Sequence, residues 1–327
     1  MSGQIAWGIV GLGNIARKFA ADLALVPGGS LRAVASRDLE KARSFAGEFR
    51  AEKAYGSYAE LFEDPTVSAV YIASPHSFHK DHTRAALLAG KHVLCEKPLG
   101  INAREVGEVV ALAREQGLFL MEALWSRFNP SIRAVYQRVR AGELGPLAYL
   151  RADFSFPALD RDPAGRLLNP ALAGGSLLDI GIYPVFLAYL MLGIPRDIKV
   201  LAHFHETGAE KQIALLFDYP GAMAVLYSGF ASRSEMKAEL SCREGSIYLN
   251  PRWHQAETYS IEREGEFQEF RNPLKGNGYT YEIEEVHACL QAGKTQSDLW
   301  SWHDSRELHA LLDRIRARAG ITFPGEA

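Results

Sequence analysis

A glycine-rich turn near the start of the chain restricts the possible folds more than any other feature. Residues 11–16, GLGNIA, follow the short β-branched segment 5–10 and open a helical pattern. In the motif G-x-G-x-x-A, Gly11 permits a tight turn, and Gly13 lets the backbone approach a pyrophosphate at the helix N-terminus. A glycine turn in an unrelated strand–helix unit is the alternative. The expected dinucleotide contacts here are Gly11, Gly13, Asn14 and Ile15.

The first 124 residues alternate between strand and helix patterns. Further strands are predicted at 31–36, 67–73, 92–95 and 118–121, and helices at 15–25, 40–49, 58–62, 79–89 and 103–116. This alternation is typical of an α/β fold with a doubly wound parallel sheet. We expect a Rossmann dinucleotide-binding domain over residues 1–124.

The second half of the chain has a different pattern. After predicted helices at 130–140 and 176–189 and a strand at 146–156, strand patterns follow closely at 197–205, 211–218, 223–228, 237–242 and 245–249. Strands without intervening helices favour a mostly antiparallel sheet with helices on one face. A final helix is predicted at 302–318. We expect an α+β substrate-binding domain over 125–327, with a large open-faced sheet.

The end of the second strand indicates which dinucleotide is bound. An acidic residue there would accept hydrogen bonds from a ribose 2′-hydroxyl, whereas arginine accommodates a 2′-phosphate. This chain has Ser36 and Arg37, which can both contact a phosphate, followed by Asp38. A shift of one residue in the alignment would restore an acid, and Arg37 alone could be a solvated helix-terminal arginine. We expect NADP in preference to NAD.

Two further segments carry groups suited to proton and hydride chemistry. Glu96 and Lys97 follow a predicted parallel strand, at the sheet edge where such folds bind ligands. The Lys97 ammonium could stabilise negative charge on a substrate oxygen, or it could simply pair with Glu96 at the surface. On a helix, Asp179 and Tyr183 share one face at i and i+4. They are either a structural pair or a carboxylate beside a phenolic acid–base.

The order of these motifs resembles the glucose–fructose oxidoreductase / inositol dehydrogenase / rhizopine catabolism (Gfo/Idh/MocA) family. The resemblance spans nearly the whole chain: GLGNIA, YIASP followed by HSFH, CEKP and LLDIGIYP. It implies a catalytic Lys97, with Asp179 and Tyr183 at the family's D-x-x-x-H positions. Tyr183 in place of histidine resembles the subgroup of the dimeric dihydrodiol dehydrogenases and glucose–fructose oxidoreductase. Further cofactor contacts implied by the resemblance are Ser74, His76, His79, Glu96 and Lys97.

The segment 121–130, MEALWSRFNP, also resembles the dihydrodiol dehydrogenase group. The resemblance implies that Trp125 and Arg127 lie beside the nicotinamide at the domain junction. An aromatic and a charged residue that only anchor an interdomain hinge are an equally good interpretation.

These arguments together predict an NADP-dependent oxidoreductase. Hydride would pass between the nicotinamide and a secondary carbinol or hemiacetal carbon of a sugar or cyclic diol, as in an aldose or trans-dihydrodiol dehydrogenase. Tyr183 would move the hydroxyl proton, Lys97 would lower the phenol pKa, and Asp179 would fix the network. The alternatives are a non-catalytic NADP-binding sensor of the same fold and a sugar–sugar oxidoreductase that retains its NADP. The sequence does not choose the sugar or diol.

Composition narrows the partners and the compartment. With 36 basic and 39 acidic residues the net charge is −3, which argues against nucleic acid as a partner. The longest apolar run, 185–194, is too short to span a membrane, and the N-terminal segment has no basic region of a targeting signal. Three scattered cysteines suit a reducing cytoplasm.

The histidines at 76, 79 and 82 have no completing ligand, so we expect no metal. The family resemblance implies a homodimer through the C-terminal sheet, where apolar residues alternate on neighbouring strands.

Overall fold

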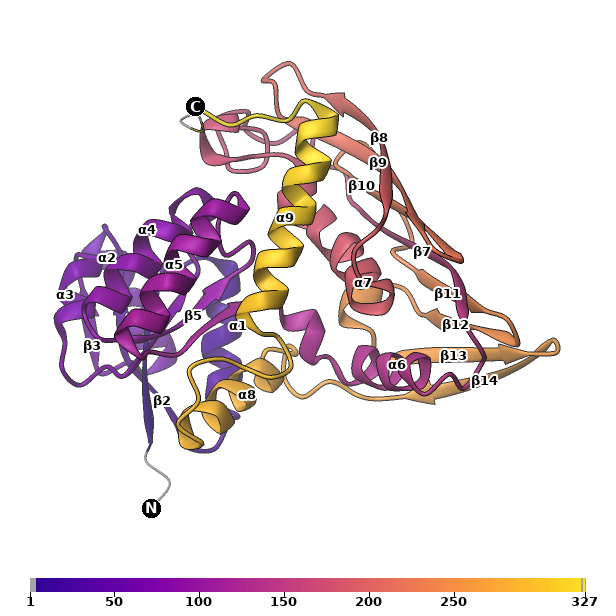
Figure 1. The fold of residues 1–327 in the computed structure, drawn as a ribbon. Coiled ribbons are helices and arrows are strands. Elements are labelled where there is room, and N and C mark those ends of the chain that lie inside the picture. Colours follow the sequence, from indigo (N-terminus) through magenta and orange to yellow (C-terminus); the bar gives the residue numbers. More distant parts are fainter. Residues whose placement is uncertain (1–3, 325, 327) are drawn as a thin grey trace. The chain divides into compact units, whose positions relative to one another are not determined.

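The computed structural model describes residues 4–324 and residue 326, which form two compact units (Figure 1). Unit 1 contains the chain up to Trp125 together with Lys275–Arg306, and unit 2 contains Ser126–Leu274 together with the chain from Glu307. The structure therefore differs from a single division near residue 124, because Lys275–Arg306 returns to unit 1. Residues 1–3, part of the N-terminal segment for which no targeting signal is predicted, lie outside the described residues.

Unit 1 is built on a six-stranded parallel sheet in the order β3-β2-β1-β4-β5-β6. Its central strands are almost continuously buried, which is typical of a parallel sheet covered on both faces. The predicted doubly wound parallel sheet is confirmed. The strands are β1 Ile5–Val10, β2 Gly29–Ala35, β3 Lys53–Tyr55, β4 Ala69–Ile72, β5 His92–Glu96 and β6 Leu120–Ala123.

Local sequence signals define the helices of unit 1. In α5, the Asn102 side chain accepts a hydrogen bond from Glu105 N at the start, and Gly117 ends the helix with φ +64°. The buried valines of α5 pack with residues of β4 and β5 in one apolar core. The helices are α1 Asn14–Leu23, α2 Leu39–Phe49, α3 Tyr58–Glu63, α4 His79–Leu88, α5 Ala103–Gln116 and α8 Thr280–Gln291.

A buried carboxylate attaches the returning segment to the rest of unit 1. Asp22, in α1, is fully buried and accepts hydrogen bonds from the backbone N and the side-chain Nδ2 of Asn277, both at 2.8 Å from Oδ1. Its Oδ2 accepts from Tyr279 N, also at 2.8 Å. These three donors stand just before α8, so Asp22 fixes the start of that helix against α1.

Unit 2 is built on an eight-stranded sheet in the order β14-β13-β12-β11-β7-β10-β9-β8. Strands β7 and β10 pair in parallel, and the other neighbouring strands pair antiparallel, as expected for a mostly antiparallel sheet. The strands are β7 Leu147–Ser155, β8 Asp197–Phe204, β9 Glu210–Tyr219, β10 Ala222–Gly229, β11 Ala238–Cys242, β12 Gly245–Leu249, β13 Thr258–Arg263 and β14 Glu266–Arg271. The sequence did not predict β13 and β14.

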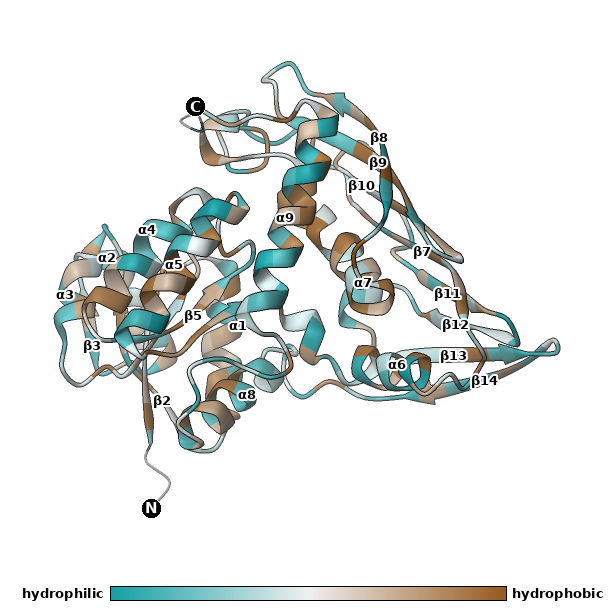
Figure 2. Cartoon of the chain, viewed as in Figure 1, coloured by the Kyte–Doolittle hydropathy of each residue, from teal (hydrophilic) through white to brown (hydrophobic). Residues whose placement is uncertain are grey.

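One face of this sheet is covered and the other is open. Helices α6 (Pro130–Arg140) and α7 (Ile182–Leu192) lie on the covered face (Figure 1). Along much of β9 and β10, buried residues alternate with half-buried or exposed ones. Both strands carry hydrophobic as well as hydrophilic residues (Figure 2). Large apolar side chains exposed on sheet strands are Leu201, Phe204, Leu216, Met223 and Phe267. The last helix, α9, spans Trp302–Ala319.

Candidate active site

The glycine turn after β1 has the shape that a dinucleotide requires. Gly11 has φ +84°, and a Cβ at this position would lie 2.4 Å from the backbone N of Ser74. Gly13 is the N-cap of α1, and a Cβ there would have no heavy atom within 4 Å. The turn is thus tight on the side of β4 and open above the helix N-terminus. Because β1 and β4 meet at the topological switch point of the sheet, this is where the fold binds a dinucleotide.

The basic and acidic side chains that follow β2 have different surroundings. Asp38 is the N-cap of α2, and its carboxylate accepts a hydrogen bond from Lys41 N at 3.2 Å. Arg37 is exposed, and among the described residues it has no acidic partner. Ser36 is buried, and its Oγ accepts a hydrogen bond from Asp38 N. The acid in this segment therefore serves as a helix cap, whereas the guanidinium remains available for an anion.

The EKP motif stands at the end of β5. Glu96 is buried, its Oε1 accepts a hydrogen bond from the Tyr71 hydroxyl, and its Oε2 accepts one from Lys97 N at 3.2 Å. Burial raises the pKa of the Glu96 carboxyl, while the Tyr71 bond and the Lys97 charge oppose this effect. Lys97 is half-buried, and the Lys97–Pro98 peptide bond is cis. Glu96 is thus held by its own turn and by β4.

The histidines after β4 support that turn. His79 is buried, with Nδ1 2.7 Å from the carbonyl oxygen of Pro98 and Nε2 2.8 Å from that of Ser74. Burial lowers the His79 pKa to about 4, while the contacts with the two carbonyl oxygens oppose this effect. His79 therefore links the turn after β4 to the EKP turn. His76 is also buried, and Ser74 Oγ lies 2.9 Å from His82 Nδ1.

In unit 2, Asp179 lies in a turn that the sequence did not predict. Residues Leu177–Gly181 form a π-helical turn that continues into α7, where a single α-helix over 176–189 was expected. Asp179 is buried and forms an ion pair with Arg166, with 2.7 Å between Oδ1 and Nη1. Arg166 belongs to the loop after β7 and is half-exposed. Single π-helical turns inside helices are frequent at functional sites.

Tyr183 is one turn beyond Asp179 and is surrounded by aromatic rings. Its side chain is 6% exposed, and its ring centroid lies 5.5 Å from those of both Phe154 and His254. Phe154 stacks on His254 at 4.3 Å. The phenol therefore has a fixed ring position, which favours a specific role for its hydroxyl. Whether Lys97, Asp179 and Tyr183 act in catalysis remains a prediction.

Trp125 and Arg127 stand on either side of the boundary between the two units. Trp125 is buried and stacks on Tyr279, with ring centroids 4.9 Å apart and an angle of 4° between the planes. The buried Arg127 lies with its guanidinium 5.1 Å above the Tyr136 ring, within unit 2. Both side chains are thus packed against aromatic rings, an arrangement compatible with the hinge and with the cofactor interpretation.

Sequence reasoning missed three residues that hold these groups in place. Arg166 pairs with Asp179, Tyr279 stacks on Trp125, and Glu210 contacts the start of the π-helical turn. The only local signal was for Glu210, a carboxylate at the start of an otherwise alternating strand. Arg166 lies only 13 positions before Asp179, in a loop without a regular pattern, whereas Tyr279 is more than 150 positions beyond Trp125.

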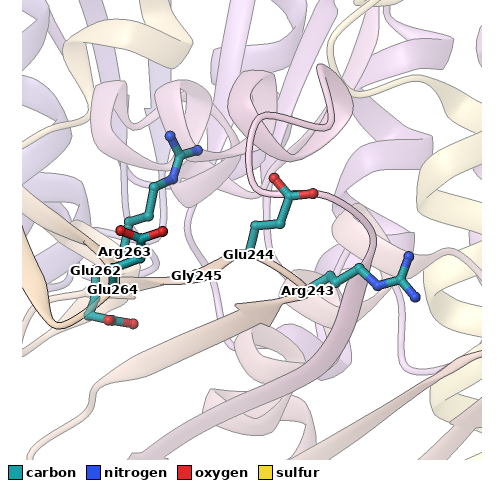
Figure 3. A pocket seen from close by; sticks show the side chains of 6 residues that line it. All are labelled: Arg243, Glu244, Gly245, Glu262, Arg263 and Glu264. Atoms are coloured by element: carbon teal, nitrogen blue, oxygen red, sulfur yellow. The ribbon is translucent and has the colours of Figure 1, made fainter.

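Other features do not combine the groups of a reaction centre. A pocket of about 470 Å³ in unit 2 is lined by Arg243, Glu244, Gly245, Glu262, Arg263 and Glu264 (Figure 3). Its charges are already engaged in part, because Glu262 accepts from Gly265 N and Arg263 donates to the Glu143 carbonyl. In the part of the chain that the structure describes, no group of three or more histidine, cysteine, aspartate or glutamate residues could hold a metal. None of the described helices is long and apolar enough to cross a membrane.

Known proteins match both halves of the chain. The family model "Oxidoreductase family, NAD-binding Rossmann fold" matches residues 5–124, and the "GFO/IDH/MocA C-terminal domain" matches residues 132–248. A trans-1,2-dihydrobenzene-1,2-diol dehydrogenase of Mus musculus is 38% identical over 333 residues, with 98% of each chain covered.

Two solved structures extend the comparison to the fold. A 3-ketoreductase from Actinomadura kijaniata in complex with NADP and TDP-benzene aligns with a TM-score of 0.86 and 28% identity, covering 97% of this chain and 98% of the other. An aldose–aldose oxidoreductase from Caulobacter crescentus aligns with a TM-score of 0.87 and 25% identity over the same shares.

Proposed function

Because this chain belongs to the Gfo/Idh/MocA family of oxidoreductases and is a dehydrogenase acting on CH–OH groups, we propose that its substrate is a cyclic diol or a sugar and its cofactor NADP. The reacting carbon is a secondary carbinol or a hemiacetal carbon. The observation that carries the proposal is the setting of two buried side chains. Asp179 lies in the π-helical turn and pairs with Arg166, and Tyr183 lies in the helix that follows and packs against Phe154. A binding protein would have no need for a phenol and a carboxylate fixed in this way.

The protein residues have separate roles in the proposed reaction. Bound NADP⁺ supplies the hydride acceptor. Tyr183 takes the proton of the substrate hydroxyl during oxidation and returns it during reduction. Lys97 hydrogen-bonds the same oxygen and favours the phenolate form of Tyr183 by its charge. Asp179, fixed by Arg166, orients the substrate or the phenol.

The choice of NADP over NAD is supported by the residues after β2. Arg37 is exposed without an acidic partner in the described residues, and Asp38 is engaged as the α2 cap. A 2′-phosphate would therefore meet Ser36 and Arg37 without displacing an existing ion pair. The family's solved 3-ketoreductase holds NADP.

A substrate screen tests the proposal. Purified protein is assayed for NADP⁺ reduction with trans-cyclohexane-1,2-diol and D-xylose, and the Y183F variant is assayed in parallel. We expect turnover with one of these classes and a loss of two or more orders of magnitude in Y183F, with NADP⁺ affinity retained. Tight NADP⁺ binding without turnover of any diol or aldose would instead favour a sensor of the same fold.

A second candidate is a sugar–sugar oxidoreductase that retains its NADP between two half-reactions. The likeness to the aldose–aldose oxidoreductase favours it. Purified protein would then carry a stoichiometric nicotinamide, detected by the absorbance of its reduced form after addition of one aldose. Loss of the nicotinamide on desalting, together with full activity when NADP⁺ is added back, would favour the ordinary dehydrogenase.

We further propose that the protein works in the cytoplasm as a homodimer that pairs through the open face of the eight-stranded sheet. The free cysteines Cys95, Cys242 and Cys289 support a reducing compartment. The exposed Leu201, Leu216 and Met223 support an apolar interface. The L216E variant should sediment as a monomer, and L88E serves as the control because Leu88 is similarly exposed on α4. A dimeric L216E would contradict this interface.

A further inference from the structure

A buried carboxyl group contacts the backbone just before Asp179. Glu210, the first residue of β9, is 1% exposed. Its Oε1 accepts a hydrogen bond from the Ser176 hydroxyl at 2.6 Å, and its Oε2 accepts one from Leu177 N at 2.8 Å. Leu177 is the first residue of the π-helical turn. Both carboxyl oxygens of Glu210 are thus used on two consecutive residues at the start of this turn.

The same contact region includes β10 and two glycines. Ser176 Oγ lies 2.9 Å from Ser228 Oγ, and both serines are buried. A Cβ on Gly181, the last residue of the turn, would lie 2.6 Å from Ser228 Oγ. Gly175, with φ +142°, forms an isolated bridge to Glu210. The turn is therefore held against the sheet at both of its ends, and at Gly181 it approaches so closely that a side chain would not fit.

We propose that Glu210 is a positioning residue for the reaction: with Ser176 and Ser228 it sets the π-helical turn and thereby the places of Asp179 and Tyr183. The inference rests on the proposed function for its activity measurement. Glu210 does not need to touch substrate or cofactor. It acts by fixing the backbone at residue 177, two residues before the carboxylate and six before the phenol. Small displacements of reacting groups reduce turnover strongly, by about 100-fold for a 1 Å shift.

The chemistry of the contact predicts which substitutions are tolerated. A glutamine at 210 keeps a carbonyl oxygen for Leu177 N, and its amide can donate to Ser176 Oγ while the Ser176 hydroxyl turns to Ser228. An alanine leaves a buried N–H and a buried hydroxyl without this acceptor. Burial raises the pKa of Glu210 to about 8, and the bonds from Ser176 and Leu177 oppose this effect. A mostly neutral carboxyl is well imitated by glutamine.

Steady-state kinetics with NADP⁺ and the best diol or aldose test the proposal. We expect kcat to fall about 50-fold in E210A and about 10-fold in S176A. The KM of both variants for NADP⁺ should stay within about twofold of the wild-type value. The kcat of E210Q should stay within about threefold of wild type. E239A is the matched control, because Glu239 also accepts from a serine hydroxyl, Ser241 at 3.0 Å, but lies in β11 away from the turn. An E210A or S176A enzyme that melts earlier but keeps its kcat within threefold would overturn the positioning role.

Hydrogen–deuterium exchange gives a readout that does not depend on activity. Amides of residues 177–183 should exchange faster in E210A and S176A than in wild type, E210Q and E239A. Unchanged exchange in this segment would also overturn the inference. If the wild-type protein turns over no diol or sugar, the proposed function fails, and the exchange measurement still decides whether Glu210 holds the turn.

Discussion

Replacing Asp22 by alanine should destabilise unit 1 more than any ordinary surface change. Asp22 accepts hydrogen bonds from three donors, two on Asn277 and one on Tyr279, at 2.8 Å each. Its own side chain is fully buried, so water does not readily replace it. A buried donor that loses its acceptor costs about 1–3 kcal/mol. Because the two donors on Asn277 are only partly buried, whereas Tyr279 N is buried, we take the lower part of this range for the Asn277 donors and expect a total of about 3–5 kcal/mol.

The assay is chemical denaturation followed by far-UV circular dichroism, with limited trypsin digestion alongside. D22A should lose about 3–5 kcal/mol of unfolding free energy, and trypsin should cleave after Lys275 faster than in wild type, because the returning segment is no longer fixed to α1. D38A is the control, since Asp38 caps one helix through a single bond to Lys41 N and should cost only about 1 kcal/mol. D22A and D38A that lose the same small free energy would refute the reasoning.

Three further predictions concern catalysis, cofactor choice and pH. K97M should lower kcat by about three orders of magnitude, while its NADP⁺ affinity, measured by fluorescence titration, should be nearly unchanged. A fully active K97M enzyme would remove Lys97 from the mechanism. R37A should raise the KM for NADP⁺ about 10- to 100-fold without raising that for NAD⁺, because one charge-assisted phosphate contact is lost; equal effects on both cofactors would contradict the phosphate role. The Glu210 pKa is raised from 4.5 to about 8, so its contribution to stability is present below pH 4.5 and is lost as pH rises toward 8. E210Q should therefore gain stability relative to wild type by up to about 4 kcal/mol between pH 5 and pH 8 in urea denaturation; a constant difference would mean an ordinary Glu210 pKa.

Two helices with capping residues match their predicted bounds to the residue. The predicted helix 103–116 matches α5 because Asn102 caps its start and Gly117 ends it with a positive φ. The predicted helix 130–140 matches α6, where Asn129 caps Ile132 N and Pro130 occupies the first helical position. These signals act within one turn of the chain. Local sequence therefore contains what is needed to place such helix ends.

Elements that depend on distant partners were missed. Strand β14 is an exposed edge strand without a buried residue, so it lacks the apolar alternation that identifies a strand. Strand β13 does alternate, with Tyr259 and Ile261 buried, but only over residues 258–262. The return of Lys275–Arg306 to unit 1 depends on Asp22, more than 250 positions earlier. The return of this segment is not visible in a local window.

The candidate site shows the same division between local and distant causes. Residue types and spacing drew attention to Lys97, Asp179 and Tyr183, and the family resemblance implied their catalytic roles, which remain predictions. The predicted helix did contain the last two. The π-helical form of the turn was not predicted, because it accompanies contacts from Glu210 and Ser228, 34 and 52 positions beyond Ser176. Leu177, Leu178 and Ile180 favour a regular α-helix, but Gly181 and Pro184 in the same segment favour a departure from it, because a proline inside a helix removes a backbone hydrogen bond. The departure from a regular α-helix also coincides with the buried carboxyl group of Glu210, which accepts hydrogen bonds from Ser176 and Leu177. A local geometry that departs from the regular helix needs support from the surrounding structure, and the residues that supply this support are therefore the ones to test together with the motif.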